Sequence, residues 1–305
     1  MIQTPGYNQP LYILPFDHRS SFTRGLLGVT GELTPQQAAK VTEFKTIIYQ
    51  GFELAVAQGV PKSAAAILVD EQFGVAILKQ AVAEGYVVCL PVEKSGQEEF
   101  DFEYGGSYVA HLTDIRPTFA KVLVRYNPEA DSALNARQRI RLRKLGLAAH
   151  EAGCKFLAEI LVPATAEQLA RFGGDNNRYD TELRPELAVR MIEEFQADGV
   201  EPDVWKIEGF SQPIDYEAVV KQAQSGGRSE VGVIILGRGG SSETVEQWLK
   251  VGAQVPGVTG FAVGRTVFWE SLVQYRDGKL SADETIAAIA VNYRHFYDVF
   301  TDARR

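Results

Sequence analysis

Residues 203–209 read DVWKIEG, a short apolar strand pattern with a lysine, Lys206, in its middle. Successive side chains of a strand point to opposite faces, so Lys206 and Trp205 lie on opposite faces. An amphipathic helical pattern at 185–198 precedes this strand, and another follows it at 216–224. The stretch therefore predicts a buried strand between two helices, which is the repeating unit of an α/β protein.

The same alternation of strand and helix recurs along the chain. The predicted strands are 11–16, 65–69, 86–91, 119–126, 156–162, 204–208, 231–237 and 260–264. The predicted helices are 35–58, 72–84, 133–152, 185–198, 216–224, 243–253 and a closing helix with an aromatic face at 282–300. Parallel strands need long crossovers, so eight such units predict a closed (β/α)8 TIM barrel. The alternative is an open doubly wound sheet, but the turn at 17–21 lacks the glycine fingerprint of its dinucleotide site.

Length and composition restrict the class of protein. The 305 residues carry 31 Lys+Arg and 39 Asp+Glu, a formal net charge of -8 that disfavours a general nucleic-acid binder. No Pro- or Ser-rich linker divides residues 1–305, so we expect one domain. Neither a signal peptide nor an apolar run of about 20 residues is present, so we expect no membrane association and a cytoplasmic location. Cys89 and Cys154 lie in apolar runs and are expected to be buried thiols.

Active sites of such barrels lie where strands run into the following loops. Lys206 shares its strand face with Val204 and Glu208 and is expected to point into the barrel. Burial removes the water that stabilises an ammonium ion, so it lowers the pKa of a lysine. This favours the neutral amine, which is the nucleophile needed to form a Schiff base. Glu159, on the preceding predicted strand, is expected next to Lys206, where a carboxylate shuttles protons. The alternatives for Lys206 are a solvated lysine on an edge strand or a structural ion pair, and the alternative for Glu159 is a structural salt bridge.

Other strand ends add charged candidates. Lys121 and Arg125 share one face of the predicted strand at 119–126. Lys121 is expected to lower the pKa of Lys206 further by like-charge repulsion. Arg125, nearer the end of the strand, is expected to bind an anionic group of the substrate. After the first strand, Asp17 is expected to orient the lysine or bind a hydroxyl, and His18 and Arg19 to hold a polar substrate group. The alternative is that these three residues form an ordinary turn exposed to solvent, which would have the same composition.

The last two strands end in glycine-arginine turns, Gly237-Arg238-Gly239 and Gly264-Arg265. Backbone N–H groups at a helix start attract phosphate, and barrel phosphate sites often follow strands seven and eight. We therefore expect these two turns to bind a substrate phosphate. His111, His150 and His295 show no ligand spacing, so neither a metal site nor a cofactor is expected.

The stretch LPFDHRSSF at 14–22, together with DVWKIE at 203–208, resembles the 2-deoxy-5-keto-gluconate 6-phosphate aldolase domain found behind 5-dehydro-2-deoxygluconokinase in myo-inositol catabolism. More distantly, the chain is similar to the class I tagatose-bisphosphate and sulfofructose-phosphate aldolases. The resemblance runs from about residue 11 to residue 300 and implies that Lys206 forms the Schiff base. It also implies acidic and basic roles for Glu159, Lys121 and Asp17.

This resemblance implies a lyase that cleaves 5-dehydro-2-deoxy-gluconate 6-phosphate into dihydroxyacetone phosphate and malonate semialdehyde. In that case Arg238 and Arg265 bind phosphate, and Arg19 or Arg125 binds the carboxylate. The alternatives are a class I aldolase for a ketose bisphosphate or sulfo-sugar phosphate, an isomerase on the same barrel, and a non-catalytic sugar-phosphate binding protein. We expect a small phosphorylated keto-sugar acid as the ligand and a homo-oligomer as the assembly.

Overall fold

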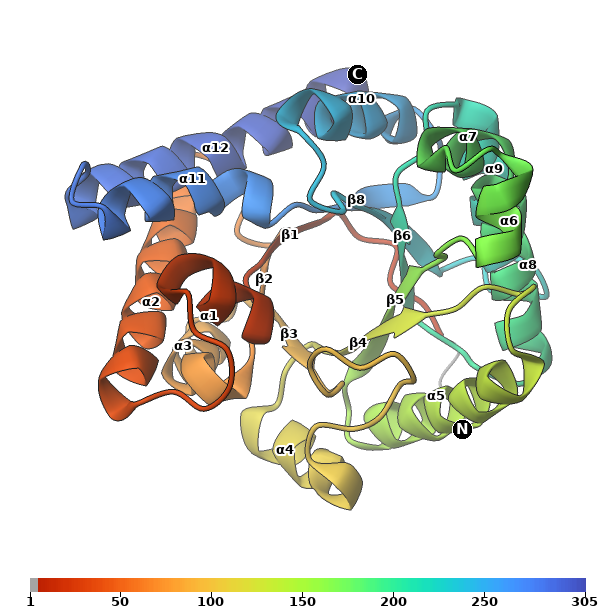
Figure 1. The fold of residues 1–305 in the computed structure, drawn as a ribbon, viewed down its shortest axis with the longest axis horizontal. Helices are drawn as coiled ribbons and strands as arrows, with labels where there is room; N and C mark the ends of the chain where they lie inside the picture. Colours follow the sequence, from red (N-terminus) through yellow and green to blue (C-terminus); the bar gives the residue numbers. More distant parts are fainter. Residues whose placement is uncertain (1–4) are drawn as a thin grey trace.

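The computed structural model describes residues 5–305, and its eight strands close into one parallel barrel in sequence order, β1 to β8. The last strand pairs with the first, since Leu11 lies beside Gly260. Figure 1 looks into the ring of strands, with the helices outside it. The strands are β1 (Leu11–Pro15), β2 (Ala65–Leu68), β3 (Val87–Pro91), β4 (Phe119–Arg125), β5 (Lys155–Leu161), β6 (Val204–Glu208), β7 (Gly232–Leu236) and β8 (Val258–Ala262). The predicted (β/α)8 TIM barrel is therefore confirmed.

Helices follow the strands and form the outer layer. They are α1 (Ser20–Leu27), α2 (Pro35–Ala57), α3 (Glu71–Ala83), α4 (Tyr108–Ile115), α5 (Ser132–Glu151), α6 (Ala166–Arg171), α7 (Asn176–Glu182), α8 (Arg184–Ala197), α9 (Pro213–Ala223), α10 (Ser242–Ala253), α11 (Arg265–Arg276) and α12 (Ala282–Ala303), with a 3₁₀ turn, η1 (Gly105–Ser107). The closing helix α12 packs along α2, α10 and α11 (Figure 1). No helix within residues 5–305 has the length and apolar character needed to cross a bilayer.

Cap residues and glycines define the ends of these helices. Thr34 forms a capping box with Gln37 at the start of α2, and Pro35 is the first residue of the helix. Gly85 follows the end of α3 with φ 78°, a left-handed conformation that favours glycine.

Two features of the chain differ from the expectation. The last strand lies two residues earlier than predicted, at Val258–Ala262, because α11 begins directly at Arg265. Five helices were not predicted: α1, α4, α6, α7 and α11. Of these, α1, α4, α6 and α7 have eight residues or fewer, too short to show a clear helical period. The sequence predicts only a turn at Gly264-Arg265, where α11 begins.

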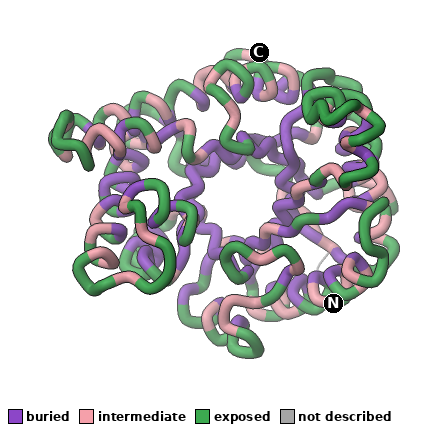
Figure 2. The backbone as a smooth tube through the Cα atoms, in the orientation of Figure 1, coloured by how far each residue is buried: buried purple, intermediate pink, exposed green. Residues whose placement is uncertain are grey.

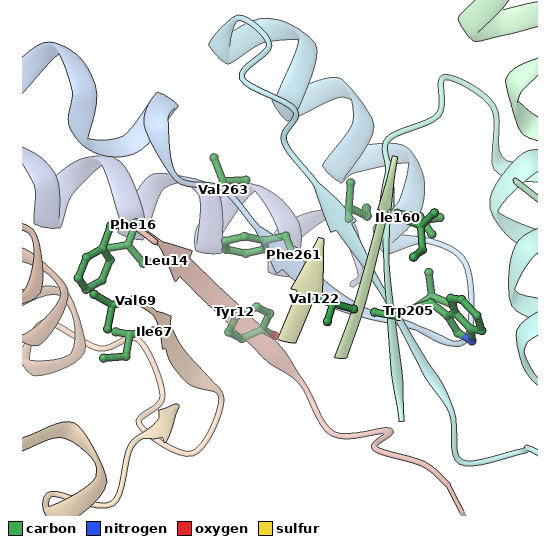
Figure 3. Packing of buried hydrophobic residues seen from close by; sticks show 14 of the residues in the cluster. Tyr12, Leu14, Phe16, Ile67, Val69, Val122, Ile160, Trp205, Phe261 and Val263 are labelled. Carbon is green, nitrogen blue, oxygen red and sulfur yellow. The ribbon is translucent and has the colours of Figure 1, made fainter. Parts of the chain in front are cut away.

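Side chains of the strands alternate between two cores. Outward-facing residues such as Trp205, Val122 and Phe261 pack under the helices (Figure 3). Inward-facing residues such as Val204, Leu157 and Ile234 fill the barrel. The strands accordingly form a buried ring inside an exposed rim of helices and loops (Figure 2). The apolar interior fills the amino-terminal part of the barrel, so polar residues further along the same strand faces are left at the carboxyl ends.

Candidate active site

A cavity of about 450 Å³ opens at the carboxyl ends of the strands. The structure brings all twelve predicted site residues to its wall: Asp17, His18, Arg19, Lys121, Arg125, Glu159, Lys206, Gly237, Arg238, Gly239, Gly264 and Arg265. They come from six of the eight strand ends, which only closure of the barrel can bring together. Cavities of this size suit small molecules.

Glu159 joins two buried lysines. Its side chain lies beside Lys206 in register across β5 and β6, as the sequence predicted. The same oxygen, Oε2, is 2.9 Å from Lys206 Nζ and 3.0 Å from Lys121 Nζ. All three side chains are at least 95 % buried. Burial alone would raise the pKa of Glu159, but the cations of Lys121 and Lys206 outweigh it and lower that pKa. Glu159 is therefore a carboxylate shared by two amines.

Lys121 is the centre of a wider cluster. Besides Glu159, its Nζ lies 2.9 Å from Asp17 Oδ2 and 2.6 Å from Glu93 Oε1. Burial would lower the pKa of Lys121, yet the three carboxylates raise it well above its usual value. The pKa of Asp17 is lowered because the charge of Lys121 outweighs its burial. Lys121 is thus held as a cation that orients Asp17, Glu93 and Glu159, and Glu159 in turn contacts Lys206.

A second buried ion pair supports the turn that carries Asp17. Lys45 of α2 is fully buried and bonds to Asp70, which follows β2. The Lys45 ammonium also donates to the carbonyl oxygens of Phe16, at 2.9 Å, and His18, at 3.2 Å. These two carbonyls bracket Asp17, so the ion pair holds its backbone from both sides.

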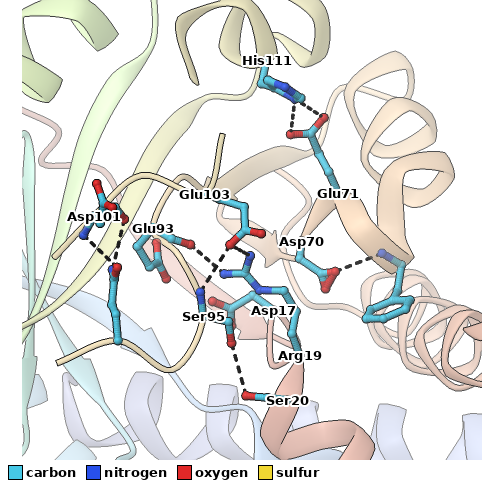
Figure 4. Close-up of polar contacts among 12 residues, drawn as sticks. Asp17, Arg19, Ser20, Asp70, Glu71, Glu93, Ser95, Asp101, Glu103 and His111 are labelled. Carbon is cyan, nitrogen blue, oxygen red and sulfur yellow. Dashed lines mark hydrogen bonds and ion pairs between the residues drawn. The ribbon is translucent and has the colours of Figure 1, made fainter. Parts of the chain in front are cut away.

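His18 and Arg19 line the cavity beside this turn. Burial lowers the pKa of His18 to about 4, so its ring is neutral at pH 7. Arg19 is 8 % exposed and lies between two acidic residues (Figure 4). Its Nη1 donates to Glu103 Oε2 at 2.8 Å, and its Nη2 to the backbone oxygen of Glu93 at 2.7 Å. Arg19 is therefore anchored, with its charge already paired.

The remaining arginines differ in what they contact. Arg125 is exposed and donates to the backbone oxygen of Gln97 at 2.9 Å. Arg238 is ion-paired twice, with Nε 2.9 Å from Glu208 Oε1 and Nη1 2.7 Å from Asp180 Oδ2. Its φ of 49° is unusual for a residue other than glycine.

Arg265, the first residue of α11, forms no ion pair with any residue from 5 to 305. Its guanidinium lies against Gly239, where a Cβ atom would come within 2.3 Å of Nη2. Gly239 has φ 69°, so glycine serves both the turn and this close approach. Of the two predicted phosphate arginines, Arg265 is thus the one whose charge is not already paired with a carboxylate.

Glu93 is the site residue that the sequence reading missed. In LPVEK at 90–94 it reads as part of a polar turn. The alternation of side chains along a strand could have identified Glu93 as a site residue. Cys89 faces the barrel interior, and Glu93 lies four residues further along, on the same face. Within the described part of the chain, no group of three or more His, Cys, Asp or Glu side chains is arranged to hold a metal ion.

The fold and the strand-end ionisable cluster place the chain among the (β/α)8 barrel proteins. Residues 3–304 match the family described as "Uncharacterized protein conserved in bacteria (DUF2090)", and the chain belongs to that family. No curated protein matched the sequence.

Solved structures with the same fold include several aldolases. Fructose-bisphosphate aldolase from Plasmodium falciparum, solved with TRAP and a small-molecule inhibitor, has a TM-score of 0.65 at 11% identity over 99% of this chain and 93% of that one. Fructose-bisphosphate aldolase from Slackia heliotrinireducens has a TM-score of 0.55 at 13% identity, covering 92% and 85%. A Corynebacterium glutamicum protein has a TM-score of 0.58 at 19% identity, covering 98% and 88%. At these identities the likeness concerns the fold.

Proposed function

We propose that the protein is a class I aldolase, a lyase that cleaves a phosphorylated keto sugar through a Schiff base on Lys206. One observation carries the proposal: Glu159 Oε2 lies within 3.0 Å of both the Lys206 and the Lys121 ammonium groups, on the wall of a cavity. A fixed carboxylate beside an amine supplies the proton transfers of Schiff-base formation. The aldolases that share the fold support the proposal.

The reaction begins when Lys206, having given a proton to Glu159, attacks the substrate ketone. The carbinolamine then loses water, with Glu159 returning the proton to the departing hydroxyl, and an iminium forms. Glu159 or Asp17 next takes the proton of the hydroxyl on the carbon β to the iminium. The bond between the α and β carbons breaks, its electrons form an enamine, and an aldehyde leaves. Protonation of the enamine carbon and addition of water release the second product and restore Lys206.

The resemblance to the inositol-pathway aldolases supports 5-dehydro-2-deoxy-gluconate 6-phosphate as the substrate. Cleavage would then yield dihydroxyacetone phosphate and malonate semialdehyde. Arg265 and the turn from Gly237 to Gly240 would bind the phosphate at the start of α11. For the carboxylate, the exposed Arg125 is favoured over Arg19, whose charge is paired with Glu103. A ketose bisphosphate or a sulfo-sugar phosphate remains the alternative for the same chemistry.

Borohydride trapping tests the proposal. Wild-type protein incubated with 5-dehydro-2-deoxy-gluconate 6-phosphate and then reduced should gain the mass of the reduced adduct, located on Lys206 by peptide mass spectrometry. Lys206→Ala should lose both adduct and turnover. Lys155→Ala, which alters a β5 lysine outside the cavity lining, should keep both. Absence of any adduct on Lys206, with cleavage abolished by a chelator, would contradict the Schiff base. Tagatose 1,6-bisphosphate, assayed in parallel, distinguishes the substrates.

A further inference from the structure

Three buried polar atoms that lack a hydrogen-bond partner belong to residues lining the same cavity. They are His18 Nδ1, Arg19 Nε and Glu93 Oε2, and no other buried side-chain nitrogen or oxygen of residues 5–305 lacks a partner. A buried polar atom without a partner costs free energy, so such atoms are rare in folded proteins. Their concentration in residues that line one cavity points to a ligand that completes their hydrogen bonds.

The three atoms are held in place by their neighbours. Glu93 is 6 % exposed, and its other oxygen, Oε1, is fixed by Lys121 at 2.6 Å. Arg19 is anchored at both terminal nitrogens, one of them on the backbone oxygen of Glu93 itself, so Arg19 and Glu93 are direct neighbours (Figure 4). Arg19 Nε, a donor, and Glu93 Oε2, an acceptor, therefore belong to two anchored side chains of neighbouring residues, and His18 lines the same cavity.

The chemistry of this pair selects the ligand group. Arg19 Nε–H can only donate a hydrogen bond, whereas the Glu93 carboxylate accepts one. A substrate carboxylate or phosphate could accept from Arg19 but would face the charge of Glu93. An ammonium could donate to Glu93 but not accept from Arg19. A hydroxyl does both, and two neighbouring hydroxyls can serve all three atoms.

We propose that Glu93, with Arg19 and His18, forms a subsite that binds the uncharged hydroxyls of the substrate carbon chain, and that Glu93 determines the preference for a polyhydroxylated ligand. The inference deepens the proposed function, since it concerns the same cavity.

Calorimetric titration with two phosphates that cannot form a Schiff base tests the subsite. Glucitol 6-phosphate and hexyl phosphate share the phosphate and the six-carbon chain, but only the first carries hydroxyls. Wild-type protein should bind glucitol 6-phosphate about tenfold or more tightly than hexyl phosphate, the range expected for hydrogen bonds to charged groups. Glu93→Gln, whose amide oxygen can still accept from Lys121, should reduce this ratio about tenfold by weakening glucitol 6-phosphate alone.

A matched control is Glu71→Gln. Glu71 is a half-buried glutamate that pairs with His111 at 2.9 Å and does not line the cavity, so its substitution should leave the ratio unchanged. Equal wild-type affinity for both ligands, failure of glucitol 6-phosphate to bind, or an unchanged ratio in Glu93→Gln would each overturn the subsite. Neither ligand has a ketone, so these results stand whether or not Lys206 is trapped. An adduct on Lys206 without a preference for the hydroxylated phosphate would support the aldolase and contradict the subsite.

Discussion

Replacing Lys121 by methionine should destabilise the protein in a way that depends on pH. The substitution keeps an unbranched apolar side chain of similar length but removes the ammonium that lies 2.6–3.0 Å from Asp17, Glu93 and Glu159. Glu159 would keep its contact with Lys206, 2.9 Å away. Asp17 and Glu93 would lose their only cation within ion-pair distance among the described residues.

The magnitude follows from the burial of this cluster. Breaking a buried ion pair by removing one partner typically costs about 3–5 kcal/mol, because the other charge stays buried. In the wild type, Lys121 lowers the pKa of Asp17. The ionised Asp17 therefore adds to the free energy of unfolding above about pH 4, and this contribution is lost as the pH falls. Without Lys121, burial and mutual repulsion raise the pKa of Asp17 and Glu93, so the variant instead loses stability as pH rises through those raised values. The loss relative to wild type should therefore be larger at pH 8 than at pH 5.

Urea unfolding followed by far-ultraviolet circular dichroism at pH 5 and pH 8 measures this difference. Lys155→Met is the matched control, because Lys155 is 31% exposed, lies 3.3 Å from Asp203 and sits outside the cavity lining. It should cost no more than about 1 kcal/mol, since partly exposed pairs contribute little. A loss below about 1 kcal/mol for Lys121→Met at both pH values, or a larger loss at pH 5 than at pH 8, would refute the reasoning.

Two other substitutions test the walls of the cavity. The pKa of His18 is 6.5 in the unfolded chain and about 4 in the folded protein, so the unfolded chain binds a proton at a higher pH. The free energy of unfolding should therefore fall by up to about 2 kcal/mol when the pH is lowered from 7 to 5. Urea unfolding of His18→Gln should lack this part of the slope, and an unchanged slope would show that His18 is not its source. In Gly264→Ala, the new Cβ would lie 2.3 Å from the backbone oxygen of Pro15, so β1 or β8 must shift. A cost of about 1–3 kcal/mol in unfolding free energy is expected, against none for Gly106→Ala, which has open space; equal values for the two would contradict the predicted clash.

The barrel and its mouth follow from local patterns. Eight apolar runs separated by helical patterns predicted the parallel closed sheet, and the parity of Lys206 against Trp205 predicted which side chain faces inward. The neighbouring position of Glu159 followed from strand order and is seen in the register of β5 and β6. These features depend on residues within one or two adjacent units, where periodicity and chain order are informative. The short helices and the start of α11 at Arg265 depend on tertiary packing and were missed.

The sequence by itself determined that a lysine lies inside a (β/α)8 barrel and that charged residues lie within or directly after six of its strands. Only the tertiary structure decided which charges pair. Lys121 pairs with Asp17, which lies 104 residues earlier in the chain. Arg238 pairs with Glu208 and Asp180. Arg265 pairs with no carboxylate of residues 5–305. The tertiary structure also shows that Glu93 pairs with Lys121. The physical reason is that an ion pair depends on ångström distances between side chains from different strands, and closure of the barrel, not spacing along the chain, sets those distances.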